Sequence, residues 1–308
     1  MNANTHQTNA PAATLRIGHS PDPDDAFMWY PLANFTGPDG QRYTPRIDTS
    51  PYNFIHVLED IQSLNQRSAQ GELEITALSI HQYAYVADQY ALTSCGASMG
   101  DGYGPMLVAR EKLALPSLVG KRIAIPGKQT SAYLGFQLHL LEQGIQPSQV
   151  QCDVVMFDQI IPKVVGGEYD AGLIIHEGQL TYGESGLHCL LDLGKWWKET
   201  RNLPLPLGGN AIRRDLGEQM PEICAILLDS IQWALGHREE SVRFALQWAR
   251  DMGHELADEF VGMYVNEWTL DYGQTGRAAV QQFLSEAAAA QLVPDCGQID
   301  FIQPAQKQ

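Results

Sequence analysis

The chain has 308 residues, of which 44% are hydrophobic and 18% are charged, and its formal net charge is −16. This composition is ordinary for a folded globular protein, and the length suffices for two compact domains with a sizeable core. The negative charge argues against binding to nucleic acid or to an anionic membrane surface. An anionic ligand would have to be held by local backbone donors or a few placed cations, which favours a small, enclosed substrate.

The N-terminal segment and the cysteines favour a cytoplasmic protein. Residues 1–14 are polar, and we expect them to form a disordered extension. They show neither the basic nor the apolar region of an export signal, and no later segment approaches the roughly 20 apolar residues of a membrane span. The five cysteines are scattered without C-x-x-C pairs, which is typical of reduced thiols and offers no zinc site.

Predicted strands and helices alternate from the start of the chain. An opening strand at 15–18 is followed by the loop Ser20–Asp25. Two prolines forbid regular structure in this loop, and Asp24 or Asp25 can cap a helix over 26–32.

Helical spacing of apolar residues at 54, 58, 61 and 64 predicts an amphipathic helix. Alternation over 72–77 predicts a strand, and Ser79 then leads into a further helix.

A second α/β unit follows a short predicted strand at 106–109. Strands are predicted over 122–125, 150–157 and 170–175, with intervening helices over 130–144 and 159–165. The segment Pro204–Gly209 is unfavourable for a helix, and we expect the chain to cross back there to the first unit. The region 221–291 is predicted to be helical.

This order of elements predicts an α/β protein with two lobes, the second inserted into the first. Lobe one would comprise 15–108 and 212–308, and lobe two 109–211, with crossings near Ala109 and Gly208. Small ligands are usually enclosed in such a cleft between lobes. Three loops would face it, namely Ser20–Asp25, Leu78–Ser79 and Gly127–Ala132.

The run Asp170–Ile175 predicts a buried strand that ends abruptly at His176 and Glu177. Ligands of open α/β sheets bind just beyond strand C-termini, where a histidine can take or give a proton near neutral pH. In the alternative, His176 only caps the strand by bonding a neighbouring carbonyl. The pair lacks the second histidine of H-E-x-x-H, so a zinc protease is excluded.

The turn Gly127–Gln129 followed by Thr130-Ser131-Ala132 opens a predicted helix. The first backbone N–H groups of a helix have no internal partner, so this segment is a natural cradle for a carboxylate or phosphate. An ordinary N-cap by Thr130 or Ser131 is the alternative. No G-K-[ST] closes the segment, so it is not a Walker loop.

Other polar groups near these loops carry weaker predictions. Asp22, Asp24 and Asp25 are interleaved with prolines and lack EF-hand spacing, so we expect no metal site. His19 and Tyr182 are further candidates for lining the cleft.

Taken together, these segments resemble the 1,4-dihydroxy-6-naphthoate synthase family of the futalosine route to menaquinone. The resemblance runs from about Leu15 to the C-terminal helices and rests on segments in the family's order: Ser20–Phe27, Pro126–Tyr133, Gly172–Glu177, Thr181–Tyr182, Asp192–Trp197, Pro204–Gly208 and Arg213–Gly217. It implies a fold similar to a type 2 periplasmic binding protein, which agrees with two lobes around a ligand cleft.

By this resemblance His176 is the catalytic base, and the substrate-binding residues are Ala77, Leu78, Ser79, Ser131 and Ala132. The implied activity is that of a lyase that converts cyclic dehypoxanthinylfutalosine to 1,4-dihydroxy-6-naphthoate and dihydroxyacetone, with no cofactor or metal. Family members can carry Lys at position 77 and Thr at position 131. Alanine at 77 leaves only backbone contact there, whereas Ser131 keeps the hydroxyl.

Two other functions stay open. Chorismate dehydratase is a sibling of the same fold earlier in the pathway, although Ile174–Glu177 with Thr181–Tyr182 favours the later enzyme. A non-catalytic solute-binding protein would share the cleft, but such proteins usually carry an export signal.

Overall fold

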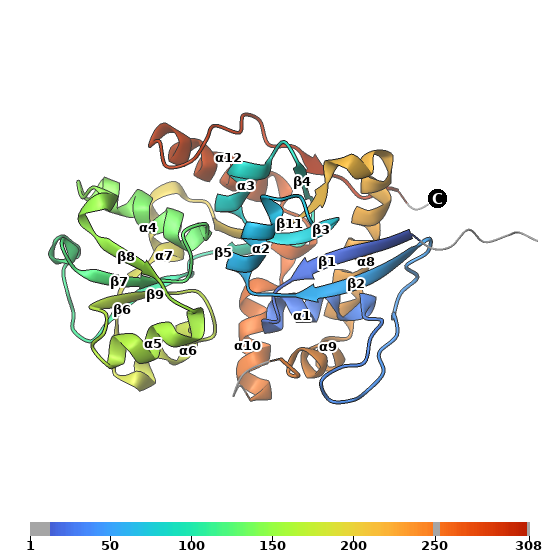
Figure 1. Cartoon of the computed structure of the whole chain (residues 1–308), viewed down its shortest axis with the longest axis horizontal. Helices are drawn as coiled ribbons and strands as arrows, with labels where there is room; N and C mark the ends of the chain where they lie inside the picture. Colours follow the sequence, from blue (N-terminus) through green and yellow to red (C-terminus); the bar gives the residue numbers. More distant parts are fainter. Residues whose placement is uncertain (1–12, 249–252, 307–308) are drawn as a thin grey trace, which may run out of the picture.

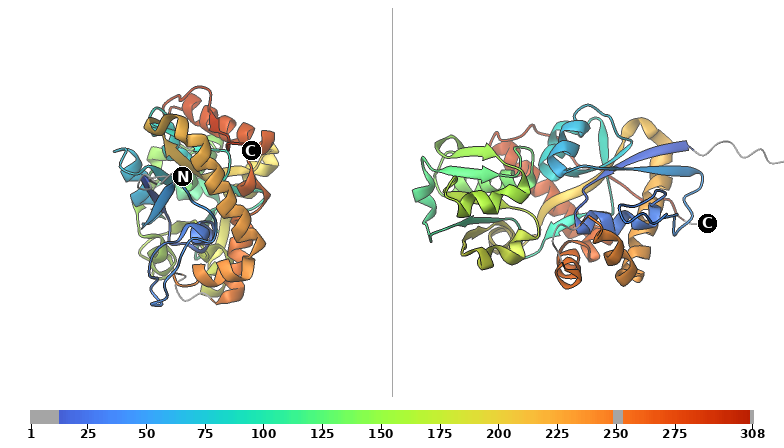
Figure 2. Two further views of the ribbon diagram at one scale, coloured as in Figure 1. Left: turned by 90° about the vertical axis from the view of Figure 1, so that its right-hand side faces the viewer. Right: turned by 60° about the horizontal axis from the view of Figure 1, so that its bottom comes forward.

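The computed structural model describes residues 13–248 and 253–306. Its two sheets and their covering helices form two lobes (Figure 1), which lie side by side in the right-hand view of Figure 2. Most of the expected extension 1–14 lies outside the described residues. Ala13 and Thr14, however, already belong to the first strand, because they pair with Tyr52 and Asn53. The extension is therefore shorter than expected.

Among the described residues, the first sheet has seven strands in the order β12-β4-β11-β3-β1-β2, with β5 paired to β11. Their bounds are β1 (Ala13–His19), β2 (Tyr52–Leu58), β3 (Ile75–Ser79), β4 (Tyr90–Thr93), β5 (Ser98–Gly100), β11 (Leu205–Arg213) and β12 (Phe301–Ile302). Strand β1 is parallel to β2 and β3, whereas β11 is antiparallel to β3. The β3–β11 register sets Ala77 opposite Asn210 and Ser79 opposite Gly208 at the centre of the sheet.

The second sheet has five strands in the described residues, in the order β10-β6-β9-β7-β8. Their bounds are β6 (Met106–Ala109), β7 (Arg122–Ile125), β8 (Gln151–Val154), β9 (Ala171–Ile174) and β10 (His188–Asp192). Strand β7 is parallel to β8 and β9. All of β9 is buried, as predicted for the apolar run before His176.

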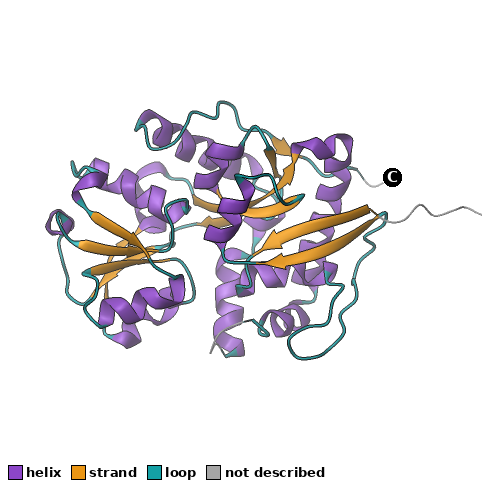
Figure 3. Ribbon diagram, in the orientation of Figure 1, coloured by secondary structure: helices purple, strands orange, loops and turns teal. Residues whose placement is uncertain are grey.

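Helices cover both lobes (Figure 3). Those of the first lobe are α1 (Pro23–Trp29), α2 (Ile61–Ser68), α3 (Ile80–Val86), α8 (Met220–Gly236), α9 (Arg238–Ala245), α10 (His254–Tyr264), α11 (Glu267–Leu270) and α12 (Gly273–Ala289). Those of the second lobe are α4 (Ser131–Glu142), α5 (Phe157–Val165), α6 (Gly178–Thr181) and α7 (Leu193–Arg201). No helix in the described part of the chain is both long and apolar enough to cross a bilayer.

The predicted helix over 54–64 is wrong in its first half. Residues Tyr52–Leu58 form β2, which pairs with β1 along its whole length. The helix α2 begins only at Ile61, where the carboxylate of Asp60 accepts hydrogen bonds from the first-turn amides. The apolar residues that suggested one helix therefore belong to two elements. Those at 54 and 58 lie in β2, and those at 61 and 64 lie in α2.

Strand pairing also moves both expected crossings toward the N-terminus. The segment Met106–Ala109 pairs with β9 and β10, so the chain has changed sheets before Met106. The whole of β11 pairs within the first sheet, so the return precedes Leu205. The prolines of 204–209 do exclude helix, but Pro206 is accommodated in the strand beside a register shift opposite β5.

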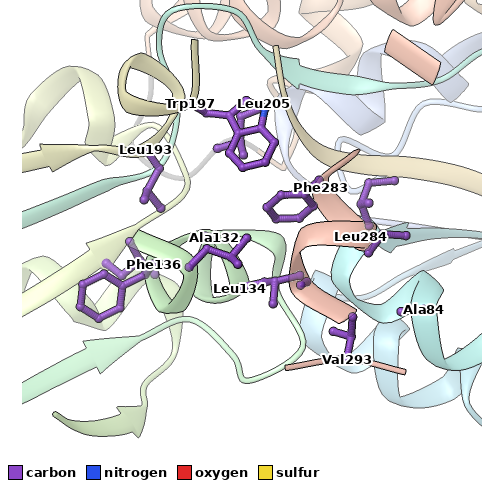
Figure 4. Packing of buried hydrophobic residues seen from close by; sticks show 14 of the residues in the cluster. Ala84, Ala132, Leu134, Phe136, Leu193, Trp197, Leu205, Phe283, Leu284 and Val293 are labelled. Carbon is purple, nitrogen blue, oxygen red and sulfur yellow. The ribbon is translucent and has the colours of Figure 1, made fainter. Parts of the chain in front are cut away.

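A single apolar cluster joins the two lobes (Figure 4). Leu134 and Phe136 of α4 and Trp197 of α7 belong to it, together with Phe283 of α12. The rings of Trp197 and Phe283 meet edge to face with centroids 5.3 Å apart. Because the cluster is continuous, it fixes the position of one lobe relative to the other.

Candidate active site

A cleft lined by residues of both lobes has about 770 Å³ of empty space, including the open solvent at its mouth. Its walls carry the loop after β1, the end of β3, the start of α4, the end of β9, the middle of β11 and part of α10. The parallel strands β1, β3, β7 and β9 all lead into this cleft at their C-terminal ends, as the topology of open α/β sheets requires.

His176 lies in the cleft wall directly after β9. Its Nδ1 is 3.1 Å from Oδ2 of Asp22, and its ring packs on that of Phe157 with centroids 3.8 Å apart. Since a carboxylate only accepts, Nδ1 carries the proton of this hydrogen bond. The other ring nitrogen, Nε2, is buried and has no hydrogen-bond partner among the described residues. The hydrogen-bonding capacity of that nitrogen is therefore not used within the described part of the chain.

The acidic loop after β1 controls the electrostatics of the cleft. Burial lowers the pKa of His176, but the nearby carboxylates, Asp22 first among them, raise it above the ordinary value overall. Burial and Asp22 raise the pKa of Asp24 to about 7, and burial and Asp24 raise the pKa of Asp25 well above its ordinary value. Desolvation thus favours the neutral carboxyl forms of Asp24 and Asp25.

The loop Ser20–Asp25 differs from the prediction that Asp24 or Asp25 caps a helix over 26–32. Helix α1 begins at Pro23 with Asp22 as its N-cap residue, whose side chain makes no capping hydrogen bond. Asp25 does not cap the helix either, because its Oδ2 accepts a hydrogen bond of 2.8 Å from the backbone N–H of Ser20. No cluster of three or more potential metal-ligating side chains occurs within the described residues.

The start of α4 presents backbone donors to the cleft. Thr130 is the N-cap and its Oγ1 accepts from the N–H of Tyr133 at 3.3 Å. The N–H groups of Ser131 and Ala132 have no hydrogen-bond partner in the described part of the chain. The Ser131 hydroxyl is already used, since it donates to the Leu207 carbonyl at 2.5 Å and accepts from the N–H of His81 at 3.1 Å. The backbone amides are thus the donors left for an anion.

Ser79 is held from behind by Asn65 of α2. The N–H of Ser79 donates to Oδ1 of Asn65 at 2.9 Å, and Nδ2 of Asn65 donates to Oγ of Ser79 at 3.0 Å. Asn65 is fully buried. Its two bonds fix both the backbone and the hydroxyl of Ser79 at the cleft wall.

Asn210 on β11 adds an acceptor to the same wall. Its Nδ2 donates to the carbonyl of Gly96 at 2.9 Å, which fixes the orientation of the amide. Its Oδ1 is buried without a hydrogen-bond partner among the described residues. A buried acceptor in a ligand cleft is costly unless the ligand supplies a donor.

The structure brings most of the candidate residues together. Those that line the cleft are Ala77, Leu78, Ser79, Thr130, Ser131, Ala132 and His176. Tyr182 lies outside the lining and packs on a small apolar cluster of the second lobe.

His19 is also outside the lining: it is buried, with Nε2 2.8 Å from Nδ1 of His56. Burial lowers the pKa of His19 to about 4, so the ring is neutral near physiological pH.

Sequence reasoning missed four residues that shape the site, namely Asp22 as the partner of His176, Asn65, Asn210 and Tyr264. Tyr264 of α10 lines the cleft and donates to Oε1 of Gln179 in the second lobe at 2.8 Å. The only local signal was the acidic Ser20–Asp25 loop. The amide side chains of Asn65 and Asn210 carry no local signal at all.

Solved structures with the same arrangement define the class of fold. A crystal structure of an Archaeoglobus fulgidus protein matches with a TM-score of 0.80 at 40% identity, over 94% of this chain and 100% of that chain. A Candida albicans protein described as having the generic periplasmic binding protein fold matches at 14% identity with a TM-score of 0.59, over 96% of this chain and 98% of that chain. The chain therefore has the periplasmic-binding-protein fold.

Residues 15–289 match the menaquinone biosynthesis family. A Thermus thermophilus relative named 1,4-dihydroxy-6-naphthoate synthase is 40% identical over 276 residues, which is 89% of this chain and 94% of the relative. A Streptomyces coelicolor relative of the same name is 37% identical over 288 residues, covering 93% of this chain and 97% of the relative. The chain belongs to this family of menaquinone biosynthesis enzymes.

Proposed function

We propose that the protein is a 1,4-dihydroxy-6-naphthoate synthase that acts as a carbon–carbon lyase in the futalosine route, with His176 as general base. The observation that carries the proposal is the His176 ring, whose Nδ1 faces Asp22 while its Nε2 has no hydrogen-bond partner among the described residues. Such an enzyme needs a general base in its cleft, and Nε2 of His176 would accept the proton. The names of the two relatives favour this enzyme over chorismate dehydratase.

The substrate would be cyclic dehypoxanthinylfutalosine, and the products 1,4-dihydroxy-6-naphthoate and dihydroxyacetone. A substrate proton passes to Nε2 of His176, and the electron pair left behind forms a new carbonyl as the adjacent C–C bond breaks. The pair from that bond passes into the ring that becomes aromatic, which makes cleavage favourable. This sequence consumes no redox equivalent. We propose the cytoplasm as its location.

The cleft walls would hold the polar groups of the substrate. The free amides of Ser131 and Ala132, at the positive end of α4, would bind the carboxylate. Ser79 and Asn210 would bind hydroxyl groups through their fixed oxygens. The raised pKa values of Asp24 and Asp25 reduce repulsion between the acidic loop and an anionic substrate.

The test is product formation by the unmodified enzyme and by His176→Asn. The purified enzyme should convert the cyclic substrate to naphthoate and dihydroxyacetone without added metal or cofactor. Because a general base typically contributes 10²–10⁴-fold, His176→Asn should lose roughly that factor in kcat and still bind the substrate. Activity retained by His176→Asn would exclude the base, and no product from the unmodified enzyme would exclude the proposed function.

A further inference from the structure

The hydrogen bond on His176 is made between the two lobes. His176 follows β9 of the second sheet, whereas Asp22 follows β1 of the first sheet and precedes α1. The atoms Nδ1 and Oδ2 are 3.1 Å apart, and both side chains are largely buried, with 12% and 16% of their surface exposed. A short contact between two largely buried polar groups of different lobes is specific, since both lobes must be correctly placed to make it.

We propose that Asp22 is a positioning residue for the base: it fixes the His176 ring with the proton on Nδ1 and leaves the lone pair on Nε2 for the substrate. This inference rests on the proposed function of His176 and adds a second residue to it. Phe157 packs on the ring, so the ring is restrained by a hydrogen bond and by an aromatic contact. Both restraints leave Nε2 without a partner among the described residues.

Other charges near His176 do not offer the same contact. Asp24 acts on the ring from α1, and Glu177 acts from the neighbouring position in the chain. Neither makes a hydrogen bond with His176 among the described residues. On α5, the helix that carries Phe157, Asp158 is exposed. Asp22 is therefore the carboxylate that sets the orientation and the tautomer of the ring, and Asp24 and Glu177 contribute charge alone.

The apolar cluster that joins the lobes bears on the geometry of this hydrogen bond. The ring and its partner belong to different sheets, so their separation depends on how the lobes pack. The edge-to-face contact of Trp197 with Phe283 and the ion pair of Arg201 with Glu286 both join α7 of the second lobe to α12 of the first. In a binding protein with freely moving lobes, this hydrogen bond would be made and broken with each motion.

Asp22→Asn tests the positioning role. It keeps the size of the side chain, but its amide can present an N–H to Nδ1 and so favour the wrong tautomer. We expect kcat to fall about 10- to 100-fold while KM changes less than about threefold. Loss of the opposite charge should also move the acidic limb of the kcat profile to lower pH by about one to three pH units. A substitution that only loosened the fold would lower activity at every pH without moving the limb.

Glu177→Gln is the matched control, because it removes a carboxylate near His176 that makes no hydrogen bond to it. We expect its acidic limb to move by less than about half a pH unit, in line with the small effect of a partly solvated charge. Asp24 also titrates near neutral pH, so both substitutions are repeated in an Asp24→Asn background. The effect of Asp22→Asn should persist there.

Titration of the His176 ring by NMR separates this inference from the proposed function, because it requires no substrate. A lower His176 pKa in Asp22→Asn, together with the kinetic shift, supports the positioning role. An unchanged His176 pKa, or a changed pKa with an unmoved kinetic limb, overturns it even if the enzyme makes naphthoate. If the unmodified enzyme makes no naphthoate, the proposed function fails, and the positioning role in that reaction fails with it, while the titration still shows whether the contact exists.

Discussion

Replacing Asn65 by alanine tests how the end of β3 is held in the cleft wall. The change removes the acceptor for the N–H of Ser79 and the donor to its Oγ, at 2.9 and 3.0 Å, together with a longer contact of 3.4 Å to the carbonyl of Gln129. Each good hydrogen bond contributes about 1 kcal/mol, and a buried N–H left without a partner costs about 1–3 kcal/mol. Asn65 and Ser79 are both buried, so water does not replace the lost bonds. We therefore expect the free energy of unfolding to fall by about 2–4 kcal/mol.

Equilibrium unfolding in urea measures this loss, and steady-state kinetics measures the consequence for the site. If Ser79 binds substrate, Asn65→Ala should also raise KM by about tenfold, which corresponds to roughly 1.4 kcal/mol of binding. Gln66→Ala is the control, since Gln66 is exposed on the same helix and should change stability by less than about 0.5 kcal/mol. A loss below that value for Asn65→Ala would refute the hydrogen-bond argument. A large loss of stability with unchanged KM would instead show that Ser79 does not contact the substrate.

Two further substitutions, the second with a control, probe the charge and the backbone of the cleft. Because the folded-state pKa of Asp24 is raised to about 7, the folded protein holds more protons than the unfolded chain between about pH 4 and 7, and stability falls as pH rises through that window. Asp24→Asn should therefore raise the melting temperature at pH 8 and leave it nearly unchanged at pH 4; an equal change at both values would contradict the raised pKa. Gly96→Ala places a Cβ 2.5 Å from Nδ2 of Asn210 at a φ of +77°, so we expect both lower stability and a higher KM. Gly102→Ala, at a φ of +84° with nothing within 4 Å, should lower stability alone, and an equal rise in KM for both variants would exclude Asn210 as a ligand contact.

The sequence predicted the parts of the site that are marked by local patterns. A buried apolar run that stops at a polar residue located His176, and a turn before Thr130 located the start of α4. Asp22 could be seen as part of an acidic loop, but its partner could not, because the contact depends on the packing of two separate sheets. Asn65 lies just past a helix predicted over 54–64, which began seven residues before α2 because β2 and α2 were merged. The Ser131 hydroxyl was expected to face the ligand, yet it is bonded to Leu207 of β11, a neighbour that only the tertiary fold supplies.

The position of β11 has a consequence for how the chain folds as it is synthesised. This strand pairs with β3 on one side and with β4 and β5 on the other, so neither β4 nor β5 can join the rest of the first sheet until Leu205–Arg213 has been made. The second sheet, by contrast, is formed entirely by strands between Met106 and Asp192. Domains fold as units during synthesis, and contacts between distant parts of a chain form late. We therefore expect the inserted lobe to become protease-resistant on the ribosome first, with the lobe that contains the N-terminal strands maturing only after it.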